Sequence, residues 1–422
     1  MSVPRSLIVS VTGAALGMSL LFACATNVEL AAQDMPQPDG GPGSVIPGPD
    51  SADGDAAADA PADVAEGGIV PGACTAGGFC FQAVPIQTPL VAISGSSPND
   101  VWAVGGSTIL RYRGTEWEQV YDYSGTTPSS ITFTGIWATS PENVWALATT
   151  NMGGSMLVRY AAVDGGTPRF YEVPTSASGS SVWVTPPSDA LWMASGSGTL
   201  TRLRDDGSGG VIRDNLVPKA SPTDTKNYAW TSVWGFGPDD VYVAGQEFSF
   251  FGGGNTPPML AHYDGTSWAL TMLAVPAGSS ADALGGTLPT GPQQIWSSTK
   301  ENSMDGPVFT VSLYPIEDGA IGSVLLQQKV TPSSPCGSKY VWATSPTSAW
   351  MSNGKIVCRW DGTKLERVTT SLGGLPTGFV RGIWAASEDD VWIVGESVPL
   401  GVGFPATGFA ARRTKDSGAS QP

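Results

Sequence analysis

One motif recurs along the chain and constrains its fold more than any other feature. The stretch "GIWATSPENVWAL" at 135–147 places two tryptophans eight positions apart around a Ser-Pro-acid turn. Variants begin at 92, 181, 232, 294, 340 and 382, so the chain holds seven units. The second aromatic residue advances in steps of 43, 47, 50, 108 and 42 residues through Trp102, Trp145, Trp192, Tyr242, Trp350 and Trp392. The double step contains the degenerate unit at 294, and the pattern indicates a repeat architecture.

Each complete unit reads as four short strands. A strand of the type "IWAT", the Ser-Pro-acid turn, "DVWAVG", a variable loop, a segment such as "LAHYDG" and a last strand such as "WEQV" follow in order. The 54 Gly and 34 Pro among 422 residues favour turns over long helices. Four antiparallel strands in about 45 residues are typical of a propeller blade. We therefore predict an all-β fold, a seven-bladed β-propeller of four-stranded antiparallel blades.

The two ends of the repeat array are complementary. The seventh unit stops at "GFAARR" (408–413) without a fourth strand. Conversely, "FCFQAVPI" (79–86) precedes the first unit and resembles the fourth strands "FYEVP" (170–174) and "WEQV" (117–120). Unpaired strand edges are a liability that closure removes. The N-terminal strand is therefore expected to complete the last blade.

Periodic side chains are interpreted as structural. "DVWAVG" is apolar on both faces, so its tryptophan is expected to pack between blades, with sugar stacking as the alternative. Arginines share one position of "LxRY", and His262 occupies it in the fourth unit, which favours a structural slot; they are Arg111, Arg159, Arg202 and Arg359. Acids before "VW" are interpreted as turn residues, because Asp favours tight turns; they are Asp239, Asp240, Asp389 and Asp390.

Catalytic signatures are absent from the sequence. It contains no nucleophile elbow, Walker loop, dinucleotide fingerprint or EF-hand loop. The arginines are periodic, whereas propeller sialidases cluster them to hold a carboxylate. The single histidine and the lack of a C-x-x-C pair argue against zinc. We predict no catalytic residue, no metal site and no cofactor.

The N-terminus carries an export signal. Arg5 precedes an apolar run from Leu7 to Phe22. This run is shorter than the roughly 20 apolar residues that a membrane-spanning helix needs, and it is typical of a secretion signal. The run ends in "LFAC" (21–24), which resembles a bacterial lipobox. That resemblance implies cleavage before Cys24 and a lipid on its thiol; the alternative is ordinary secretion with Cys24 removed. In such lipoproteins an Asp after the cysteine usually marks the inner membrane, so Ala25 implies the outer membrane, on either leaflet.

Composition divides the rest of the chain. Residues 25–72 hold nine acids and no Lys or Arg, and account for more than half of the net charge of -16. We therefore predict a signal peptide at 1–23, a disordered tether at 24–72, the propeller at 73–413 and a disordered tail at 414–422. The remaining body is also acidic, which argues against nucleic-acid binding.

Four cysteines remain beyond Cys24, an even number in a chain expected to reach an oxidising compartment. Three pairings are possible. We favour Cys74 with Cys80 and Cys336 with Cys358, because each pair closes a local loop.

The repeat also resembles a known group. The pattern S-P-x-D-V-W-A-V-G followed by Y-D-G-T-x-W is similar to that of secreted bacterial β-propeller lipoproteins, loosely akin to Asp-box and Kelch-type propellers. The resemblance covers 79–413. From this resemblance together with the absence of catalytic signatures, we predict a surface-tethered monomeric binding or scaffold module with a protein or glycan ligand. A degenerate extracellular glycoside hydrolase or lyase is the first alternative, and a purely structural envelope role is the second.

Strand parity predicts which face binds. In a four-stranded blade, the loop between strands two and three and the link to the next blade emerge on one face. The long segments beginning at 121, 213, 246, 271 and 396 are all expected there. Loops on a rigid frame commonly carry binding residues. We predict a contact patch of loop aromatics, whose alternative is packing onto blade four; it consists of Phe248, Phe250, Phe251, Tyr228 and Trp230.

Overall fold

The computed structural model describes residues 70–415 except 124–129, 164, 174–178, 180, 186–189, 196–197, 207–209, 222, 249–256, 274, 276–278, 287–292, 304–305, 318, 331–335, 337–338, 369, 371–377 and 398–405. The predicted signal peptide, Cys24 and most of the predicted tether lie outside the described residues. The chain divides into two units, Met1–Asp63 and Val64–Pro422, and all described residues belong to the second.

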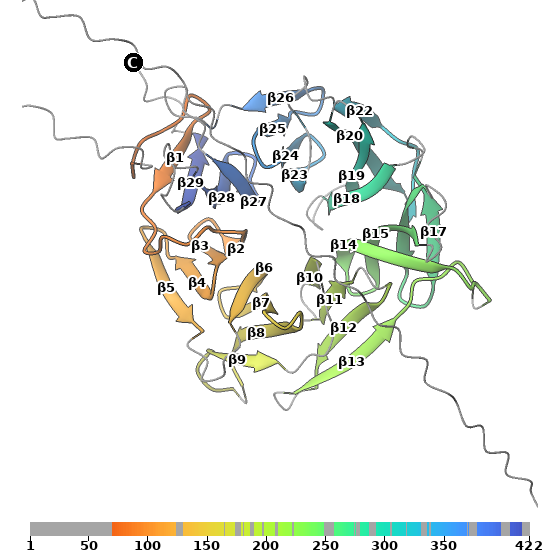
Figure 1. The fold of residues 1–422 in the computed structure, drawn as a ribbon, viewed down its shortest axis with the longest axis horizontal. Coiled ribbons are helices and arrows are strands. Elements are labelled where there is room, and N and C mark those ends of the chain that lie inside the picture. The colour runs from red at the N-terminus through yellow and green to blue at the C-terminus, as the bar shows by residue number, and fades with distance from the viewer. Residues whose placement is uncertain are drawn as a thin grey trace, which may run out of the picture. The chain divides into compact units, whose positions relative to one another are not determined.

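Every named element of the described residues is a β-strand, and the strands form seven antiparallel sheets around one axis (Figure 1). The predicted seven-bladed β-propeller is confirmed. We number the blades by the order of their innermost strands, which line the axis. Each of these strands begins a repeat unit.

The strands of each blade run outward from the axis in chain order. Blade 1 holds β2 (Ala92–Ser97), β3 (Asp100–Gly105), β4 (Thr108–Tyr112) and β5 (Trp117–Asp122). Blade 2 holds β6 (Ile131–Ser140), β7 (Asn143–Thr150), β8 (Ser155–Ala161) and β9 (Arg169–Val173). Blade 3 holds β10 (Ser181–Thr185), β11 (Ala190–Ala194), β12 (Leu200–Asp205) and β13 (Val211–Leu216).

The other blades repeat this order with variations in the fifth and seventh. Blade 4 holds β14 (Asn227–Gly237), β15 (Asp240–Phe248), β16 (Pro258–Tyr263) and β17 (Trp268–Met272). Blade 5 holds β18 (Ser279–Gly286), β19 (Gln294–Ser303) and β20 (Gly306–Glu317), on which β21 (Ala320–Ile321) and β22 (Leu326–Val330) both pair. Blade 6 holds β23 (Tyr340–Ser345), β24 (Ser348–Ser352), β25 (Val357–Trp360) and β26 (Leu365–Val368). Blade 7 holds β27 (Phe379–Ser387), β28 (Asp390–Glu396), β29 (Gly408–Thr414) and β1 (Phe79–Gln82).

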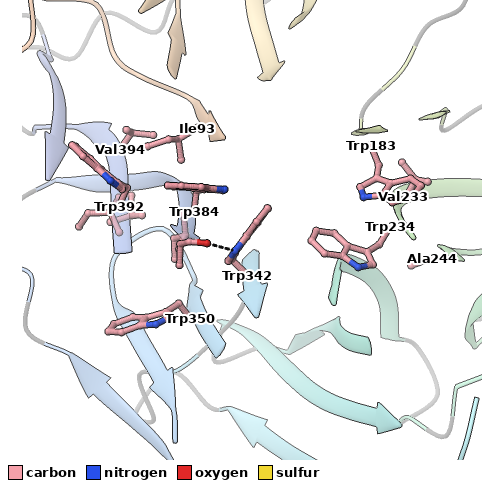
Figure 2. Close-up of a cluster of buried hydrophobic side chains, with 14 of the residues drawn as sticks. Ile93, Trp183, Val233, Trp234, Ala244, Trp342, Trp350, Trp384, Trp392 and Val394 are labelled. Carbon is pink, nitrogen blue, oxygen red and sulfur yellow. Dashed lines mark hydrogen bonds between the residues drawn. The ribbon is translucent and has the colours of Figure 1, made fainter. Parts of the chain in front are cut away.

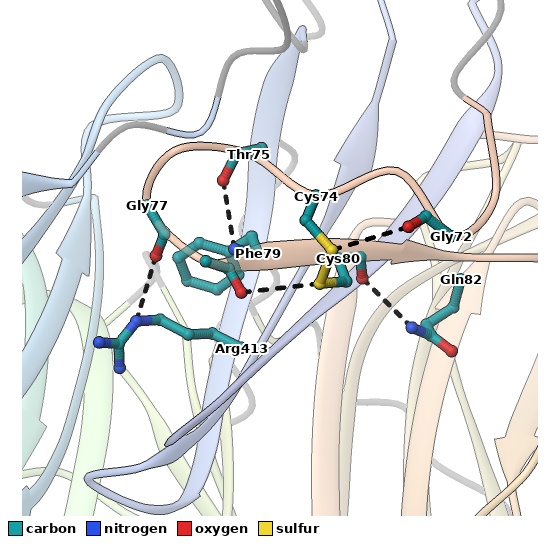
Figure 3. The surroundings of a disulfide bond; sticks show 9 residues. Gly72, Cys74, Thr75, Gly77, Phe79, Cys80, Gln82 and Arg413 are labelled. Carbon is teal, nitrogen blue, oxygen red and sulfur yellow. Dashed lines mark hydrogen bonds between the residues drawn. A yellow bond between two sulfur atoms is a disulfide. The ribbon is translucent and has the colours of Figure 1, made fainter. Parts of the chain in front are cut away.

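The predicted ring closure is confirmed. Strand β1 pairs antiparallel with β29, from Phe79 opposite Arg413 to Gln82 opposite Ala410. Figure 3 shows this junction, where Arg413 Nε donates to the backbone oxygen of Gly77 at 3.2 Å. Phe79 is fully buried, and its ring lies edge-on to Trp350 of blade 6 with centroids 5.9 Å apart. The N-terminal strand therefore joins blades 6 and 7 as well as both ends of the ring.

Both favoured disulfides are present. The Cys74–Cys80 bond sits at the start of β1 and ties the turn before this strand (Figure 3). The Cys336–Cys358 bond joins the segment before β23 to the third strand of the same blade. Each bond closes a short loop in sequence, as the local pairing requires.

The fifth blade corrects the predicted unit boundary. The segment "QIWSSTKEN" was expected to begin the fifth unit, yet it forms β19, the second strand of its blade. The first strand is β18, which lies within the segment at 271 that was expected to be a long loop. Trp296 is therefore a second-strand tryptophan, and it divides the step of 108 residues into two of 54. The prediction failed because Gly285 stands opposite Trp296, where other units carry a first tryptophan.

The second-strand tryptophans pack between blades, as predicted. All six residues of β3 are buried. Trp102 contacts Tyr160 and Phe170 of blade 2, with ring centroids 5.5 and 6.3 Å away. Trp392 of blade 7 packs in the same way against Tyr112 and Trp117 of blade 1. These contacts make each blade part of its neighbour's core.

The arginine slot is structural, as predicted. The Arg111 guanidinium carbon lies 4.4 Å from the Trp102 ring centroid, and Arg111 Nε donates to Asp100 at 2.7 Å. In blade 4 His262 stacks on Tyr242 at 4.2 Å, and its Nε2 lies 2.8 Å from Asp240. The same arrangement recurs around the ring, with Arg159 on Trp145, Arg202 on Trp192, Arg359 on Trp350 and Arg412 on Trp392. Cation–π contacts of this kind contribute about 0.5–2 kcal/mol each, depending on desolvation.

The ring has two faces of different construction. On the turn face, the hairpin between strands one and two lies against the turn between strands three and four, since a Cβ on Gly265 would lie 2.8 Å from Asp239. On the link face, the loop between strands two and three lies against the link from the preceding blade, since a Cβ on Gly105 would lie 2.2 Å from the oxygen of Pro89. This arrangement agrees with the parity expected from the sequence. The segment at 271 departs from it, because β18 runs through it.

Candidate functional site

Five tryptophans from five blades meet on the ring axis. Trp137 of blade 2 contacts Trp342 of blade 6 across the ring, with centroids 5.6 Å apart. Trp342 Nε1 donates to the backbone oxygen of Ala385 at 2.9 Å, which fixes this ring (Figure 2). Neighbouring members lie 5.4 to 6.4 Å apart. We call this set the tryptophan layer; it consists of Trp137, Trp183, Trp234, Trp342 and Trp384.

Small residues on the innermost strands make room for the layer. A Cβ on Gly95 would lie 2.6 Å from the Trp384 ring, and a Cβ on Gly235 would lie 2.5 Å from the Trp183 ring. Blade 1 carries Ser94 at the axial position, and its hydroxyl oxygen accepts a hydrogen bond from the backbone N–H of Ala138 at 3.0 Å. The tryptophan layer therefore depends on glycine at positions where the backbone approaches an indole.

The tryptophan layer separates two cavities. The cavity on the link face has a volume of about 330 Å³, and we call it the link-face cup. Its floor is formed by Trp137, Trp234 and Trp342, and its wall by the first residues of the innermost strands. In five of the seven blades, the residue three places before the axial position lines this wall; the set is Val91, Thr134, Thr231, Lys339 and Arg381. A volume of this size is at the lower end of small-ligand sites.

Two cations face the link-face cup, and none of its lining residues is an acid. The Lys339 ammonium lies 5.6 Å from the Tyr340 ring centroid and forms no ion pair with any described residue. Arg381 pairs with Glu396, and this hydrogen bond raises the pKa of the Arg381 guanidinium. Among the described residues, the cup therefore offers the Lys339 ammonium without an ion-pair partner and the Arg381 guanidinium held by Glu396, both beside aromatic side chains.

A third cation borders the same place. The Lys355 ammonium lies 5.7 Å from the ring centroid of Phe379, and the Arg381 guanidinium carbon lies 5.4 Å from the same centroid. Lys355 comes from the turn between β24 and β25, so blades 6 and 7 together present three cations. The chain as a whole has a net charge of -16, so this part of the surface is positive on an otherwise acidic protein. A carboxylate is the ligand group that such an arrangement favours.

The cavity on the turn face has a volume of about 310 Å³, and we call it the turn-face cup. All five members of the tryptophan layer line it, together with small neutral residues such as Gly95, Ala138, Ala385 and Ala386. No lysine, arginine or acid is among its lining residues. The two cups therefore share a floor and differ in chemistry.

Three of the five residues of the predicted contact patch are described, and they do not form one exposed surface. Phe248 is 46% exposed at the end of β15, whereas Trp230 is fully buried and Tyr228 is 5% exposed. Phe250 and Phe251 lie outside the described residues. Tyr228 and Trp230 are buried in blade 4 and line neither the link-face cup nor the turn-face cup, so they are not the exposed loop aromatics that the sequence predicted.

The cause of this burial is the length of β14. The strand continues for eleven residues, and its alternation directs Tyr228 and Trp230 inward, where they stack with centroids 5.5 Å apart. The Tyr228 hydroxyl donates to Asp224 at 2.6 Å, and burial together with this carboxylate raises the pKa of Tyr228. These rings order the link before blade 4, which is the alternative stated for them.

The acids that precede "VW" were interpreted as turn residues, and two of them have a further role. Asp240 lies against His262, and Asp390 accepts two hydrogen bonds from Arg412, at 2.8 and 2.7 Å. The pairing with Asp390 raises the pKa of Arg412. These carboxylates therefore hold the side chain of the structural slot, His262 in blade 4 and Arg412 in blade 7. No group of three or more His, Cys, Asp or Glu within the described ranges is arranged to hold a metal ion.

Sequence reasoning missed the residues of the link-face cup. Lys339 and Arg381 each stand three places before a first tryptophan, in "KYVW" and "RGIW". Aligning the units on that tryptophan would have placed both at the same end of the innermost strand. The signal was present, but the first tryptophan was not distinguished from the second, so its axial position went unrecognised.

No protein-family model and no curated protein matches the chain. Solved structures of propellers do. The WD40 β-propeller domain of Doa1 is 13% identical, with a TM-score of 0.53 over 81% of this chain and 99% of that one. Raptor from Chaetomium thermophilum is 8% identical, with a TM-score of 0.53 over 78% of this chain and 29% of that one. A structure described as YCF48 bound to D1 peptide is 14% identical, with a TM-score of 0.49 over 80% of this chain and 97% of that one.

These comparisons define the class of the protein through its fold alone. At such identities the shared feature is the β-propeller ring, and the ligand-binding residues of one member do not transfer to another. Within the described part of the chain, no helix is long and apolar enough to cross a membrane.

Proposed function

We propose that the protein is a lipid-anchored extracytoplasmic binding module that holds a carboxylate-bearing ligand in the link-face cup. The observation that carries the proposal is that Lys339 and Arg381 line the same cavity above an aromatic floor, with no acid among the lining residues. A pocket with an apolar floor and a few convergent polar groups is the common form of a ligand site.

The physical argument rests on charge and desolvation. Lys339 has no ion pair among described residues, so a ligand carboxylate would not have to displace a protein carboxylate from it. Arg381 already shares its guanidinium with Glu396, which fixes its position and leaves other N–H groups available. A charge-assisted hydrogen bond in such a site contributes about 1.5–3 kcal/mol.

The ligand should also carry an apolar group next to its carboxylate. The floor of the link-face cup presents the rings of Trp137, Trp234 and Trp342, and its wall includes Ile93 and Ile136. A free peptide C-terminus ending in an apolar residue combines both features, and an acidic sugar offers the charge with a flatter apolar face. We favour the peptide, because most of the side chains that line the cup are apolar.

Peptides with a free C-terminal carboxylate test this proposal directly. An array of short peptides ending in apolar residues, each also made as the C-terminal amide, is probed with the protein body 73–422. We expect binding to free acids and a loss of tenfold or more for the amides, in line with one charge-assisted bond. Glucuronate-containing oligosaccharides form the second arm, and binding confined to them would replace the peptide by an acidic glycan.

Two charge reversals assign the site. Lys339→Glu should weaken binding of the selected peptide by at least tenfold, because it places a carboxylate beside that of the ligand. Lys364→Glu is the matched control, since Lys364 is an exposed lysine of the turn between β25 and β26 on the turn face. Equal effects of the two variants, or none, would remove the link-face cup as the binding site.

The anchor is proposed from Cys24 and the apolar run before it. An outer-membrane lipid would hold the ring at the envelope, with the acidic segment 25–72 as its tether. Labelling with palmitate in a bacterial host should give a labelled chain, and Cys24→Ala should abolish the label. Labelling that survives this change would end the lipoprotein proposal and leave the binding proposal standing.

A further inference from the structure

The turn-face cup shares part of the tryptophan layer with the link-face cup and differs from it in its wall and its charge. Its floor contains all five rings of the tryptophan layer, and its wall consists of glycine, alanine, serine, threonine and proline. Trp183 and Trp384 line this cup and not the other one. An aromatic floor with small walls allows a compact group to approach the rings closely.

Acids stand on three of the five described hairpin tips at the mouth of this cup, those of blades 2, 4 and 7. The hairpin tips between strands one and two carry Glu142, Asp239, Glu388 and Asp389, and no described tip carries a lysine or arginine. Glu388 lies 4.0 Å from Arg359, whereas Glu142, Asp239 and Asp389 form no salt bridge with a described residue. Carboxylates grouped around a low-dielectric cavity focus a negative potential on it.

The acids stand at the rim, and the cavity itself is neutral. An anion would meet repulsion there without a compensating cation, and a hydrated metal ion would find aromatic rings where it needs oxygen ligands. A neutral apolar molecule would gain contact with the rings and nothing from the rim. An organic cation gains from both, because aromatic rings attract cations and organic cations are weakly hydrated.

We propose that the turn-face cup binds an organic ammonium group, a positively charged nitrogen that carries carbon substituents. Methyl groups would contact the tryptophan layer while the charge lies below the acidic rim. The volume of about 310 Å³ accommodates a trimethylammonium group or the end of a lysine side chain. This site is independent of the link-face cup, since each opens on its own face of the ring.

Choline and its uncharged isostere 3,3-dimethylbutan-1-ol provide the test, because they share a shape and differ in charge. Ligand-observed NMR on the protein body 73–422 measures both affinities. We expect choline to bind at least fivefold more tightly, and the difference to shrink as salt screens the rim. Equal affinities would show an apolar site without cation recognition and would overturn the proposal, as would a failure of choline to bind.

A matched pair of variants places the site. Pro98→Lys adds a cation to a tip that lines the turn-face cup, and Thr134→Lys adds one to the wall of the link-face cup. Choline binding should fall at least fivefold in the first variant and stay within twofold in the second. The reverse result would move the ammonium site to the link face.

A third variant tests the rings. Trp384→Leu keeps apolar bulk and removes an aromatic face that only the turn-face cup uses. We expect choline to lose more affinity than the alcohol does, since the alcohol depends on contact area alone. Peptides with a free or trimethylated lysine then distinguish a protein source of the ammonium group from a small quaternary amine. Preference for choline over both peptides would identify the small molecule as the source.

Discussion

Phe79→Ala should destabilise the whole ring although Phe79 lies near the start of the described chain. Its side chain is fully buried, and its ring packs edge-on against Trp350 of the preceding blade. Strand β1 also covers the outer edge of β29, so this residue anchors the strand that closes the ring. The substitution opens a cavity at that junction.

The size of the effect follows from cavity formation. Removing a buried phenylalanine ring costs about 3–5 kcal/mol. Over the ring from Phe79 to Thr414, the entropy of unfolding is about 0.7 kcal/mol/K at about 2.1 cal/mol/K per residue. A loss of about 3–5 kcal/mol therefore lowers Tm by about 4–7 °C. Deleting 77–88 also removes the buried Phe81, and the combined loss approaches the whole stability of a typical domain.

Thermal and urea unfolding of the protein body measure this prediction, with Gln82→Ala as the control on the same strand. The Gln82 side chain makes one hydrogen bond, to the backbone oxygen of Cys80 at 3.2 Å, so its removal should cost no more than about 1 kcal/mol. If Phe79→Ala melted within a degree of the control, or if the deletion of 77–88 left Tm unaltered, closure by β1 would not stabilise the ring.

Three other predictions concern the electrostatic and covalent parts of the fold. Hydrogen bonds from Lys364 and Thr363 lower the pKa of Asp361 to about 2. The stabilising effect of the Asp361 carboxylate is therefore complete above about pH 4 and is lost as the pH falls through about 2. The Tm difference between wild type and Asp361→Asn should vanish toward pH 2, and a difference that stays constant with pH would refute this prediction. Arg111→Met should cost about 3–5 kcal/mol in urea unfolding, because it leaves the buried Asp100 carboxylate without its cation. Adding Asp100→Asn should recover part of that loss, and additive losses would contradict the pairing. Replacing both Cys336 and Cys358 by Ser should cost about 3 kcal/mol, against about 2 for Cys74 and Cys80, because the first pair closes the longer loop; peptide maps showing free thiols at these positions would remove the basis of the comparison.

The architecture was predictable because a propeller repeats one pattern. Each second-strand tryptophan must fill the space between two blades, so it recurs at a nearly constant step. The missing fourth strand of the last unit and the extra strand before the first unit then required the pairing of Phe79–Gln82 with β29. The two disulfides were predictable for another reason, because each pair of cysteines closes a loop that is short in sequence.

Blade 5 was misread because its innermost strand carries no aromatic residue. Gly285 faces the axis there, and its backbone lies against blade 6, since a Cβ would meet the oxygen of Val341 at 2.8 Å. A glycine that allows two backbones to approach closely adds no hydrophobic residue to the sequence pattern, so the strand was predicted as a loop. Its second strand, with Trp296, was then taken for the first.

The candidate site was predicted less well than the fold. Tyr228 and Trp230 alternate along β14, and a period of two in a strand extension should have indicated burial. The link-face cup depends on side chains from several blades that meet only when the ring closes. The number and tilt of the blades set how far these side chains lie from the axis, and the sequence of one repeat unit does not contain this information.

The central claim is that the tryptophan layer separates two cups that recognise opposite charges. Trp137 lines both cups, whereas Trp183 and Trp384 line the turn-face cup alone. Fluorine NMR of protein labelled with 5-fluorotryptophan, assigned by single Trp→Phe variants, follows these rings while a peptide with a free C-terminal carboxylate is added. The peptide should shift the Trp137 resonance and leave those of Trp183 and Trp384 unmoved. Shifts at Trp183 and Trp384 with Trp137 unchanged would contradict binding of the carboxylate in the link-face cup.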